Sequence, residues 1–227
     1  MGKDIEFDFM GVACSGYLSL PQKEGAKAVM VIQEWWGLVP HIKAVVDRLA
    51  SIGFVAYAPD LYHGQIAKEP DNARKLLMEL ELDGAAQELN AAAGYLLELP
   101  EVSSKTVGTL GFCMGGALAI WSATISGDIS TAVGYYPGQS WERHKPQWGK
   151  LKAKQIQIHC SEGDGTSEAD SIVEAVLNIN SAGGFVETFD YPGTLHAFFN
   201  DDRPEVFNMD AAELSWNRTI KFLNQIP

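Results

Sequence analysis

Residues 109–119 read TLGFCMGGALA, and they set one cysteine among three glycines where an apolar run meets an alanine-rich one. The apolar run, residues 106–112, predicts a buried strand, and the alanine-rich run after it predicts a helix. In α/β folds, ligand sites form where the carboxyl ends of strands lead into helices. The motif G-x-C-x-G-G has the layout of the nucleophile elbow G-x-S-x-G, with sulfur in place of the hydroxyl. Cys113 is therefore a candidate nucleophile.

The glycines fit such an elbow. We expect Gly111 and Gly115 to leave room for neighbouring backbone, and Gly116 to bring the helix start close to the sheet. The helix N-terminus supplies free N–H groups and a positive dipole end, which favour a thiolate and an oxyanion. The alternative is a buried cysteine that only packs in a glycine-rich turn. For the other two cysteines, Cys14 and Cys160, packing is the favoured interpretation.

Apolar runs alternate with segments of helical periodicity from residue 28 to the end of the chain. The pattern predicts strands at 28–33, 54–60, 106–112, 130–138, 155–160 and 185–193, with a helix after each of them except 130–138. Such alternation predicts an α/β fold with a mostly parallel central sheet and helices on both faces. Residues 5–20 read as extended segments and predict an antiparallel N-terminal edge. Without an internal repeat or linker, residues 1–227 are expected to form a single domain.

Composition narrows the function. The chain has 227 residues, of which 46% are hydrophobic and 20% charged, which suits one domain with a sizeable core. Its formal net charge of -12 disfavours binding to nucleic acid or to an anionic membrane. The N-terminus lacks the features of a signal peptide and no apolar stretch is long enough for a membrane helix, so a cytoplasmic location is expected.

The three cysteines are sparse and the five histidines show no metal-ligand spacing. Reduced thiols are therefore expected, and neither a metal nor another cofactor is predicted. The expected partner is a small molecule, and the chain is expected to be a monomer or a weak homodimer.

A cysteine nucleophile needs a base, and the base needs a carboxylate to orient it. In α/β-hydrolases these groups follow in the order nucleophile, acid, histidine. Asp164 lies in the loop after the predicted strand 155–160, and His196 lies in the loop after 185–193, so both fit that order. Glu162 and Glu168 compete for the orienting role, but Asp164 is favoured because glycines flank it directly after the strand.

Five segments of the chain resemble the dienelactone hydrolase family of α/β-hydrolases, and the resemblance covers most of the chain from about residue 5. They are VIQEWWGL (31–38), AYAPDLYHG (56–64), GFCMGG (111–116), the strand and GDG loop around Asp164, and GTLHAFFND (193–201). The resemblance implies hydrolysis of a small ester or lactone through a thioester acyl-enzyme. It implies Cys113 as nucleophile, His196 as base and Asp164 as the acid that fixes the imidazole.

The resemblance also implies a role for Glu34, because the equivalent glutamate of the family contacts the nucleophile's sulfur and participates in its activation. A carboxylate beside Trp35 and Trp36 is poorly solvated, so its pKa should rise and let it exchange a proton. The oxyanion hole would consist of the backbone N–H groups of Met114, just past the elbow, and of Trp35.

Substrate identity stays open. In the best-known family members an arginine four residues after the histidine helps to hold a substrate carboxylate, but here that position is Asn200. A neutral lactone or ester is therefore as plausible as dienelactone. The predicted substrate contacts are Tyr136, Phe198 and Arg203, with Trp35 as a further wall of an apolar pocket. Residues 62–84 are a candidate lid.

Two other functions compete with hydrolysis. A redox-sensing thiol protein would use Cys113 with Cys14 or Cys160 as the resolving thiol, but the ordered acid and histidine would then be superfluous. A small-molecule-binding protein on a hydrolase scaffold would need none of the catalytic groups, all of which are present here.

Overall fold

The computed structural model describes residues 1–138 and 141–227, without the side chains of residues 166–168. In this part of the chain one sheet holds eight strands in the order β1-β2-β4-β3-β5-β6-β7-β8. The strands are β1 (Lys3–Phe9), β2 (Val12–Ser19), β3 (Ala26–Ile32), β4 (Phe54–Pro59), β5 (Val102–Phe112), β6 (Ile129–Tyr135), β7 (Gln155–Ser161) and β8 (Phe185–Tyr191). The helices are α1 (Pro40–Ser51), α2 (Pro70–Glu79), α3 (Leu82–Glu98), α4 (Met114–Ile125), the short 3₁₀ helix η1 (Trp148–Leu151), α5 (Thr166–Ser181) and α6 (Met209–Leu223).

The sheet is antiparallel at its N-terminal edge and parallel elsewhere. Strand β1 pairs antiparallel with β2, and β2 pairs antiparallel with β4. Met10 and Gly11 join β1 to β2 with φ values of 54° and 83°, the positive angles that a tight two-residue hairpin requires. Every later pairing, from β3–β4 to β7–β8, is parallel. The prediction of a mostly parallel sheet with an antiparallel edge is confirmed.

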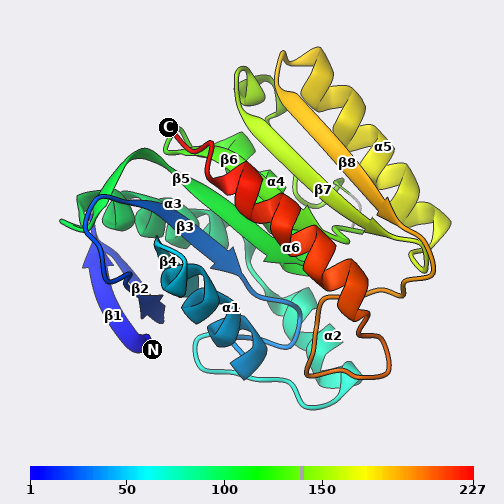
Figure 1. Ribbon diagram of the computed structural model, residues 1–227, viewed down its shortest axis with the longest axis horizontal. Helices are drawn as coiled ribbons and strands as arrows, with labels where there is room; N and C mark the ends of the chain where they lie inside the picture. Colours follow the sequence, from blue (N-terminus) through cyan, green and yellow to red (C-terminus); the bar gives the residue numbers. More distant parts are fainter. Residues whose placement is uncertain (139–140) are drawn as a thin grey trace.

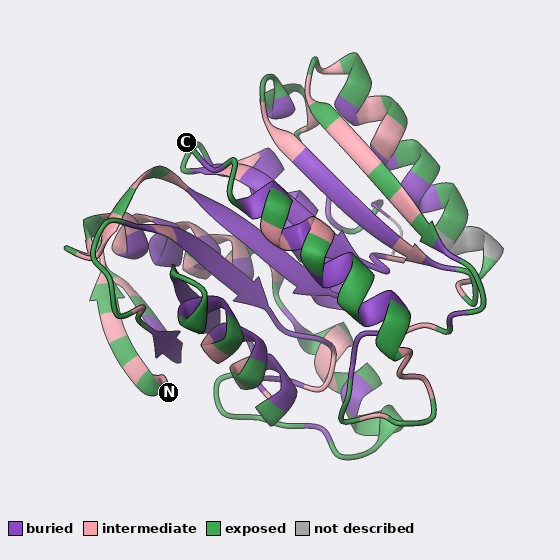
Figure 2. Ribbon diagram, in the orientation of Figure 1, coloured by how far each residue is buried: buried purple, intermediate pink, exposed green. Residues whose placement is uncertain are grey.

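Helices cover both faces of the sheet (Figure 1). Alternate side chains of β3 point to opposite faces, so Met30 and Ile32 pack with α3 and α4 while Val29 and Val31 pack with α1 and α6. The central strands are buried on both faces, whereas β1 and β8 form the more exposed edges (Figure 2). Two apolar layers therefore hold the carboxyl ends of the central strands rigidly in place.

Two segments differ from the sequence-based expectation. The run 130–138 ends as a strand at Tyr135, because Tyr136 has a φ of 37° and Pro137 follows it. Residues 62–84, expected to be mixed, form a loop, helix α2 and the start of α3. Helix α2 is polar and buries little besides Ala73, which is why its periodicity is weak in the sequence. Among the described residues, no helix is both long and apolar enough to cross a bilayer.

Candidate active site

Cys113 lies in the sharp turn between β5 and α4. Its backbone has φ 54° and ψ -119°, a conformation that non-glycine residues rarely adopt. Hydrogen bonds impose it: the Cys113 N–H donates to the Tyr135 carbonyl at 3.0 Å, and its own carbonyl accepts from the Gly116 N–H at 3.0 Å. The side chain is only partly buried. The turn therefore holds the thiol out of the sheet at the carboxyl end of β5.

The glycines of the elbow are required by close backbone approaches. A Cβ atom on Gly115 would collide with the carbonyl oxygen of Ile32, and one on Gly111 would collide with the carbonyl of Gly115. A Cβ on Gly116 would lie 2.7 Å from the carbonyl oxygen of Tyr135. The expected roles of the three glycines are confirmed, and the elbow packs directly against the end of β3.

His196 and Asp164 meet at the same edge of the sheet. Nδ1 of His196 lies 2.6 Å from Oδ1 of Asp164, and a bond of 2.9 Å from the Gly163 N–H to the Thr194 carbonyl joins their loops. Burial alone would lower the pKa of His196, but the hydrogen bond to Asp164 and the nearby sulfur of Cys113 outweigh it and raise the pKa to about 10. The imidazole therefore faces both a carboxylate and a sulfur, and these neighbours favour its positive form.

Glu162 and Glu168 are the other candidates for the carboxylate that orients His196. Oε2 of Glu162 accepts a hydrogen bond of 2.6 Å from the exposed Gly193 N–H. The side chain of Glu168 lies outside those that the structure describes. Asp164 is thus the carboxylate bonded to His196, and its side chain is only 6% exposed.

Glu34 is the second residue after β3 and is 2% exposed. Its Oε2 accepts a hydrogen bond of 2.9 Å from Nδ2 of Asn200. Burial raises the pKa of Glu34, although the nearby charge of His41, the Asn200 bond and the charge of His196 act against the rise. Position 200, where the family places an arginine, here binds the buried carboxyl group with a neutral amide.

The two predicted oxyanion donors flank this region. Met114 is the first residue of α4, and Trp35 follows Glu34 in a turn closed by a 3.2 Å bond from the Gly37 N–H to the Glu34 carbonyl. Within the described residues, neither the Met114 nor the Trp35 N–H donates to a protein atom. The Trp35 ring is half-buried and lies 5.2 Å from the Trp36 ring, centroid to centroid.

The three residues predicted to contact substrate lie in different surroundings. Tyr136 lies at the site: its ring is 4.9 Å from that of His196, and burial together with the charges of Glu34 and Cys113 raises its pKa well above the usual value. Phe198 packs against Tyr136 with ring centroids 5.4 Å apart, and both side chains are fully buried, so neither ring presents surface to a ligand in this structure. Large aromatic residues near strand ends often join the core, and Phe198 does so here.

Arg203 is engaged elsewhere. Its Nε and Nη2 atoms both lie 2.9 Å from Oε1 of Glu205. Its positive charge still reaches Glu34, where it slightly opposes the rise of the carboxyl pKa. The guanidinium is therefore near the site but already bound to a carboxylate.

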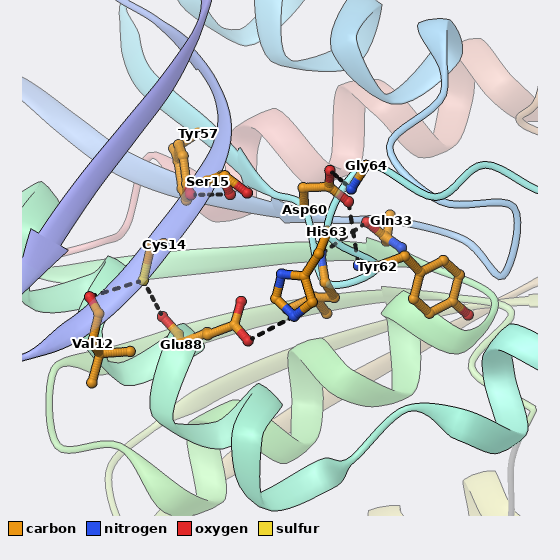
Figure 3. Close-up of polar contacts among 11 residues, drawn as sticks. Val12, Cys14, Ser15, Gln33, Tyr57, Asp60, Tyr62, His63, Gly64 and Glu88 are labelled. Atoms are coloured by element: carbon orange, nitrogen blue, oxygen red, sulfur yellow. Dashed lines mark hydrogen bonds and ion pairs between the residues drawn. The ribbon is translucent and has the colours of Figure 1, made fainter.

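Tyr62 is a neighbour of the elbow that sequence reasoning missed. Its hydroxyl lies 3.3 Å from Sδ of Met114, and burial followed by the charge of Cys113 raises its pKa. Figure 3 shows how the loop after β4 is held: Asp60 accepts bonds from the Tyr62 N–H at 3.2 Å and the Gly64 N–H at 2.6 Å. The segment AYAPDLYHG carried the signal, since a Pro-Asp turn at a strand end places the next side chains over the site.

The candidate lid is bound at one end. Arg143, in the loop after β6, donates to the carbonyl oxygens of Leu77 at 2.9 Å, Met78 at 3.4 Å and Leu80 at 2.5 Å. These are the carbonyls at the carboxyl end of α2 that a helix leaves unpaired. A cation at that end also suits the helix dipole.

Cys14 and Cys160 are free thiols, the first buried and the second partly buried. Sγ of Cys14 contacts the carbonyl oxygens of Val12 at 3.8 Å and Glu88 at 3.9 Å (Figure 3). Burial raises the pKa of Cys14 to about 11 and that of Cys160 to about 12. Thiols that stay protonated are poor resolving groups, which weakens the redox-sensor alternative. Among the described side chains, no three potential ligands gather in a metal-binding group.

Comparison with known proteins agrees with this geometry. The family model of the dienelactone hydrolase family matches residues 14–227. The Aquifex pyrophilus protein usf is 34% identical over 236 residues, covering 99% of both chains. Carboxymethylenebutenolidase 1 of Cupriavidus pinatubonensis is 30% identical over 219 residues, covering 91% of this chain and 89% of that protein.

A solved structure shares the fold. It belongs to a dienelactone hydrolase-like promiscuous phosphotriesterase from metagenomic libraries and has a TM-score of 0.85 at 18% identity, covering 100% of this chain and 98% of the other. The sheet order, the elbow and the family match lead to one conclusion: this chain is an α/β-hydrolase that belongs to the dienelactone hydrolase family.

Proposed function

We propose that this enzyme hydrolyses small, uncharged esters or lactones through a thioester acyl-enzyme formed on Cys113. The observation that carries the proposal is the position of the His196 imidazole, which is bonded to Asp164 at 2.6 Å and lies near enough to Cys113 for the sulfur to help raise the imidazole pKa. This is the nucleophile, base and orienting acid arrangement of covalent acyl transfer.

Acylation begins with a thiolate and an imidazolium. The sulfur of Cys113 attacks the substrate carbonyl, and the N–H groups of Met114 and Trp35 stabilise the negative oxygen that develops. Losing one such donor typically costs about 10²–10³ in rate. As the tetrahedral intermediate collapses, the His196 imidazolium gives its proton to the leaving alkoxide. This first half-reaction yields an alcohol, the acylated cysteine and a neutral imidazole.

Deacylation uses the neutral imidazole as a base. His196 takes a proton from water while the water oxygen attacks the thioester carbonyl, and the carbon–sulfur bond breaks to release the carboxylic acid. Asp164 holds the ring by its Nδ1–H throughout and stabilises the positive charge that returns to it. The thiolate and imidazolium are restored. Thiolates leave readily, so esters and lactones suit this site better than unactivated amides.

Glu34 is proposed to take part in activating Cys113. Its carboxyl group is buried with a raised pKa, so it can hold or release a proton inside the site. Tyr136 faces both Glu34 and Cys113, which supports placing the two groups in one environment. A protonated Glu34 leaves the neighbouring thiolate unopposed, whereas an ionised one disfavours it.

The proposed substrate is uncharged because the cations near the site are engaged. Asn200 supplies an amide to Glu34, and Arg203 is bound to Glu205. The half-buried ring of Trp35, next to Glu34, offers apolar surface at the site. The cytoplasmic location and the monomeric or weakly dimeric state stay predictions. Gel filtration checks the oligomeric state.

The test uses p-nitrophenyl butyrate and a pair of lactones that differ by one carboxylate. The wild-type protein should hydrolyse the ester and the neutral lactone with a higher kcat/KM than the anionic one. Mass spectrometry after rapid acid quench should find the acyl group on the Cys113 peptide, and Cys113→Ala should abolish both signals. A folded protein without turnover of any substrate would contradict hydrolysis and favour a binding protein. Preference for the anionic lactone would contradict only the substrate class.

A further inference from the structure

His41 is a buried titratable group that the proposed reaction does not use. It is the second residue of α1, it is 4% exposed, and its ring packs edge-on against Phe112 and Phe199 at centroid distances of 6.0 and 6.2 Å. Nδ1 lies 2.9 Å from Oδ1 of Asp201. Within the described residues, its buried Nε2 has no hydrogen-bond partner. Such a group needs an explanation, since buried polar atoms are nearly always paired.

Next to the His41–Asp201 contact lies a second polar contact, made by the preceding residue, Asn200. Asn200 binds Glu34 and Asp201 binds His41, each at 2.9 Å. Glu34 lies in the loop between β3 and α1, and His41 lies at the start of α1. Asn200 and Asp201 both lie in the loop that carries His196. The two adjacent contacts tie the loop of the buried carboxyl group to the loop of the base.

The charges around Glu34 come from several elements. His41 faces it from α1, His196 and Arg203 face it from the loop after β8, and Tyr136 faces it from the end of β6. Among these groups, a positive His41 is the strongest influence favouring the ionised carboxylate against the effect of burial. His41 thus acts on Glu34 more strongly than the base does.

Asp201, the partner of His41, lies at the protein surface. The side chain of Asp201 is 70% exposed, whereas that of His41 is 3% exposed. The guanidinium of Arg48, about two turns further along α1, also faces Asp201. The contact thus joins a buried imidazole to a carboxylate at the protein surface.

We propose that His41, held by Asp201, is a positioning residue that sets the charge of Glu34 and thereby the reactivity of Cys113. This inference rests on the proposed role of Glu34 in activating the nucleophile. When His41 carries a proton, Glu34 is ionised more readily and its negative charge opposes the thiolate. When His41 is neutral, Glu34 keeps its own proton to higher pH and the thiolate is unopposed.

The test measures how fast iodoacetamide alkylates Cys113 between pH 5 and 9, read from the mass of the Cys113 peptide. His41→Asn keeps a donor near Asp201 but removes the charge. It should move the alkylation profile to lower pH by about one unit, the size of a single nearby charge effect. Glu34→Gln should move it in the same direction, and His41→Asn should add nothing in the Glu34→Gln background. Asp201→Asn should cause a smaller shift of the same sign.

Two controls separate this role from a structural one. His63→Gln removes an exposed imidazole that lies 3.5 Å from Glu88 and does not face Glu34, so its profile should match the wild type. His41→Gln provides a second neutral variant if His41→Asn does not fold. An unshifted profile in a folded neutral variant would overturn the inference, as would an equal shift in the Glu34→Gln background. Alkylation needs no ester turnover, so failure of the hydrolase proposal would be seen separately, in the p-nitrophenyl butyrate assay.

Discussion

Nδ1 of His196 lies 2.6 Å from Oδ1 of Asp164, although 32 residues of chain separate them. The two side chains meet because β7 and β8 are parallel neighbours, so the loops that follow them open at the same edge of the sheet. Cys113 joins them from the end of β5, two strands away in the sheet order. The geometry of the site is therefore a consequence of strand order more than of local sequence.

Replacing Asp164 with Asn should reduce kcat/KM for p-nitrophenyl butyrate on the order of 10²–10⁴-fold, because the ring loses both its orientation and the partner of its positive charge. The upper limit of the pH profile should fall as well, since the Asp164 bond raises the pKa of His196. The matched control is Glu162→Gln, whose exposed carboxylate binds the Gly193 N–H. Similar losses in both variants would contradict the assigned orienting role.

The protonated His196 should stabilise the fold over a defined pH range. Its pKa is raised from 6.5 to about 10, so the folded protein holds this proton more tightly than the unfolded chain. The stabilisation is complete below about pH 6.5 and is lost as the pH rises to about 10. The free energy of unfolding in urea, compared between wild type and His196→Gln, should show a difference that disappears across this range. A difference that stays constant from pH 6 to 10 would disprove it.

Replacing Gly115 with Ala should destabilise the protein by about 1–3 kcal/mol or prevent folding, because the new Cβ meets the carbonyl oxygens of Ile32 and Gln33. Gly84→Ala is the control: it lies in α3, a Cβ there has open space, and the change should stabilise by up to about 1 kcal/mol. Urea unfolding measures both. Equal stability of the two variants would mean that the elbow can shift away from β3.

Replacing Arg143 with Ala should loosen α2. The guanidinium loses its bonds to the carbonyls of Leu77, Met78 and Leu80, so hydrogen exchange of the α2 amides should accelerate about 5- to 10-fold. Arg143→Lys keeps the charge but not the forked donors, and it should give an intermediate rate. Unchanged exchange in the Ala variant would show that α2 is held by other contacts.

Replacing Arg203 with Ala should leave KM for an anionic ester within about twofold of the wild type, because the guanidinium is bound to Glu205 rather than available to a substrate carboxylate. The Glu205→Gln variant frees the guanidinium and should lower KM for the anionic ester only. A large rise of KM in Arg203→Ala would return this residue to the substrate contacts.

The fold could be predicted because its signals are local. Buried parallel strands read as continuous apolar runs, and the tight turn at Met10 and Gly11 joins the two strands of the antiparallel edge. The end of β6 was placed too late because Tyr136 continues the apolar run while its backbone turns away. Helix α2 was missed as an element because only Ala73 in it is buried, so no apolar stripe marks it.

The positions of Cys113, Asp164 and His196 could be predicted because each follows a strand, and strand ends converge in this fold. The neighbours of Glu34 could not. Asn200 and Asp201 are two polar residues in a loop, and His41 stands beside a proline at a helix start, so each resembles an ordinary capping or surface residue in the sequence. Only the packing of the loops shows that they pair. Tyr136 and Phe198 are both fully buried although the sequence predicts them as substrate contacts, since the sequence does not distinguish an aromatic ring that lines a site from one inside the core.

The groups around the elbow come from both halves of the chain, which matters while the protein is being made. A nascent chain that has released Cys113 from the ribosome still lacks the imidazole at position 196 and the loop that binds Glu34 and His41. The catalytic arrangement therefore cannot assemble before synthesis has passed position 196, when most of the chain has already been made.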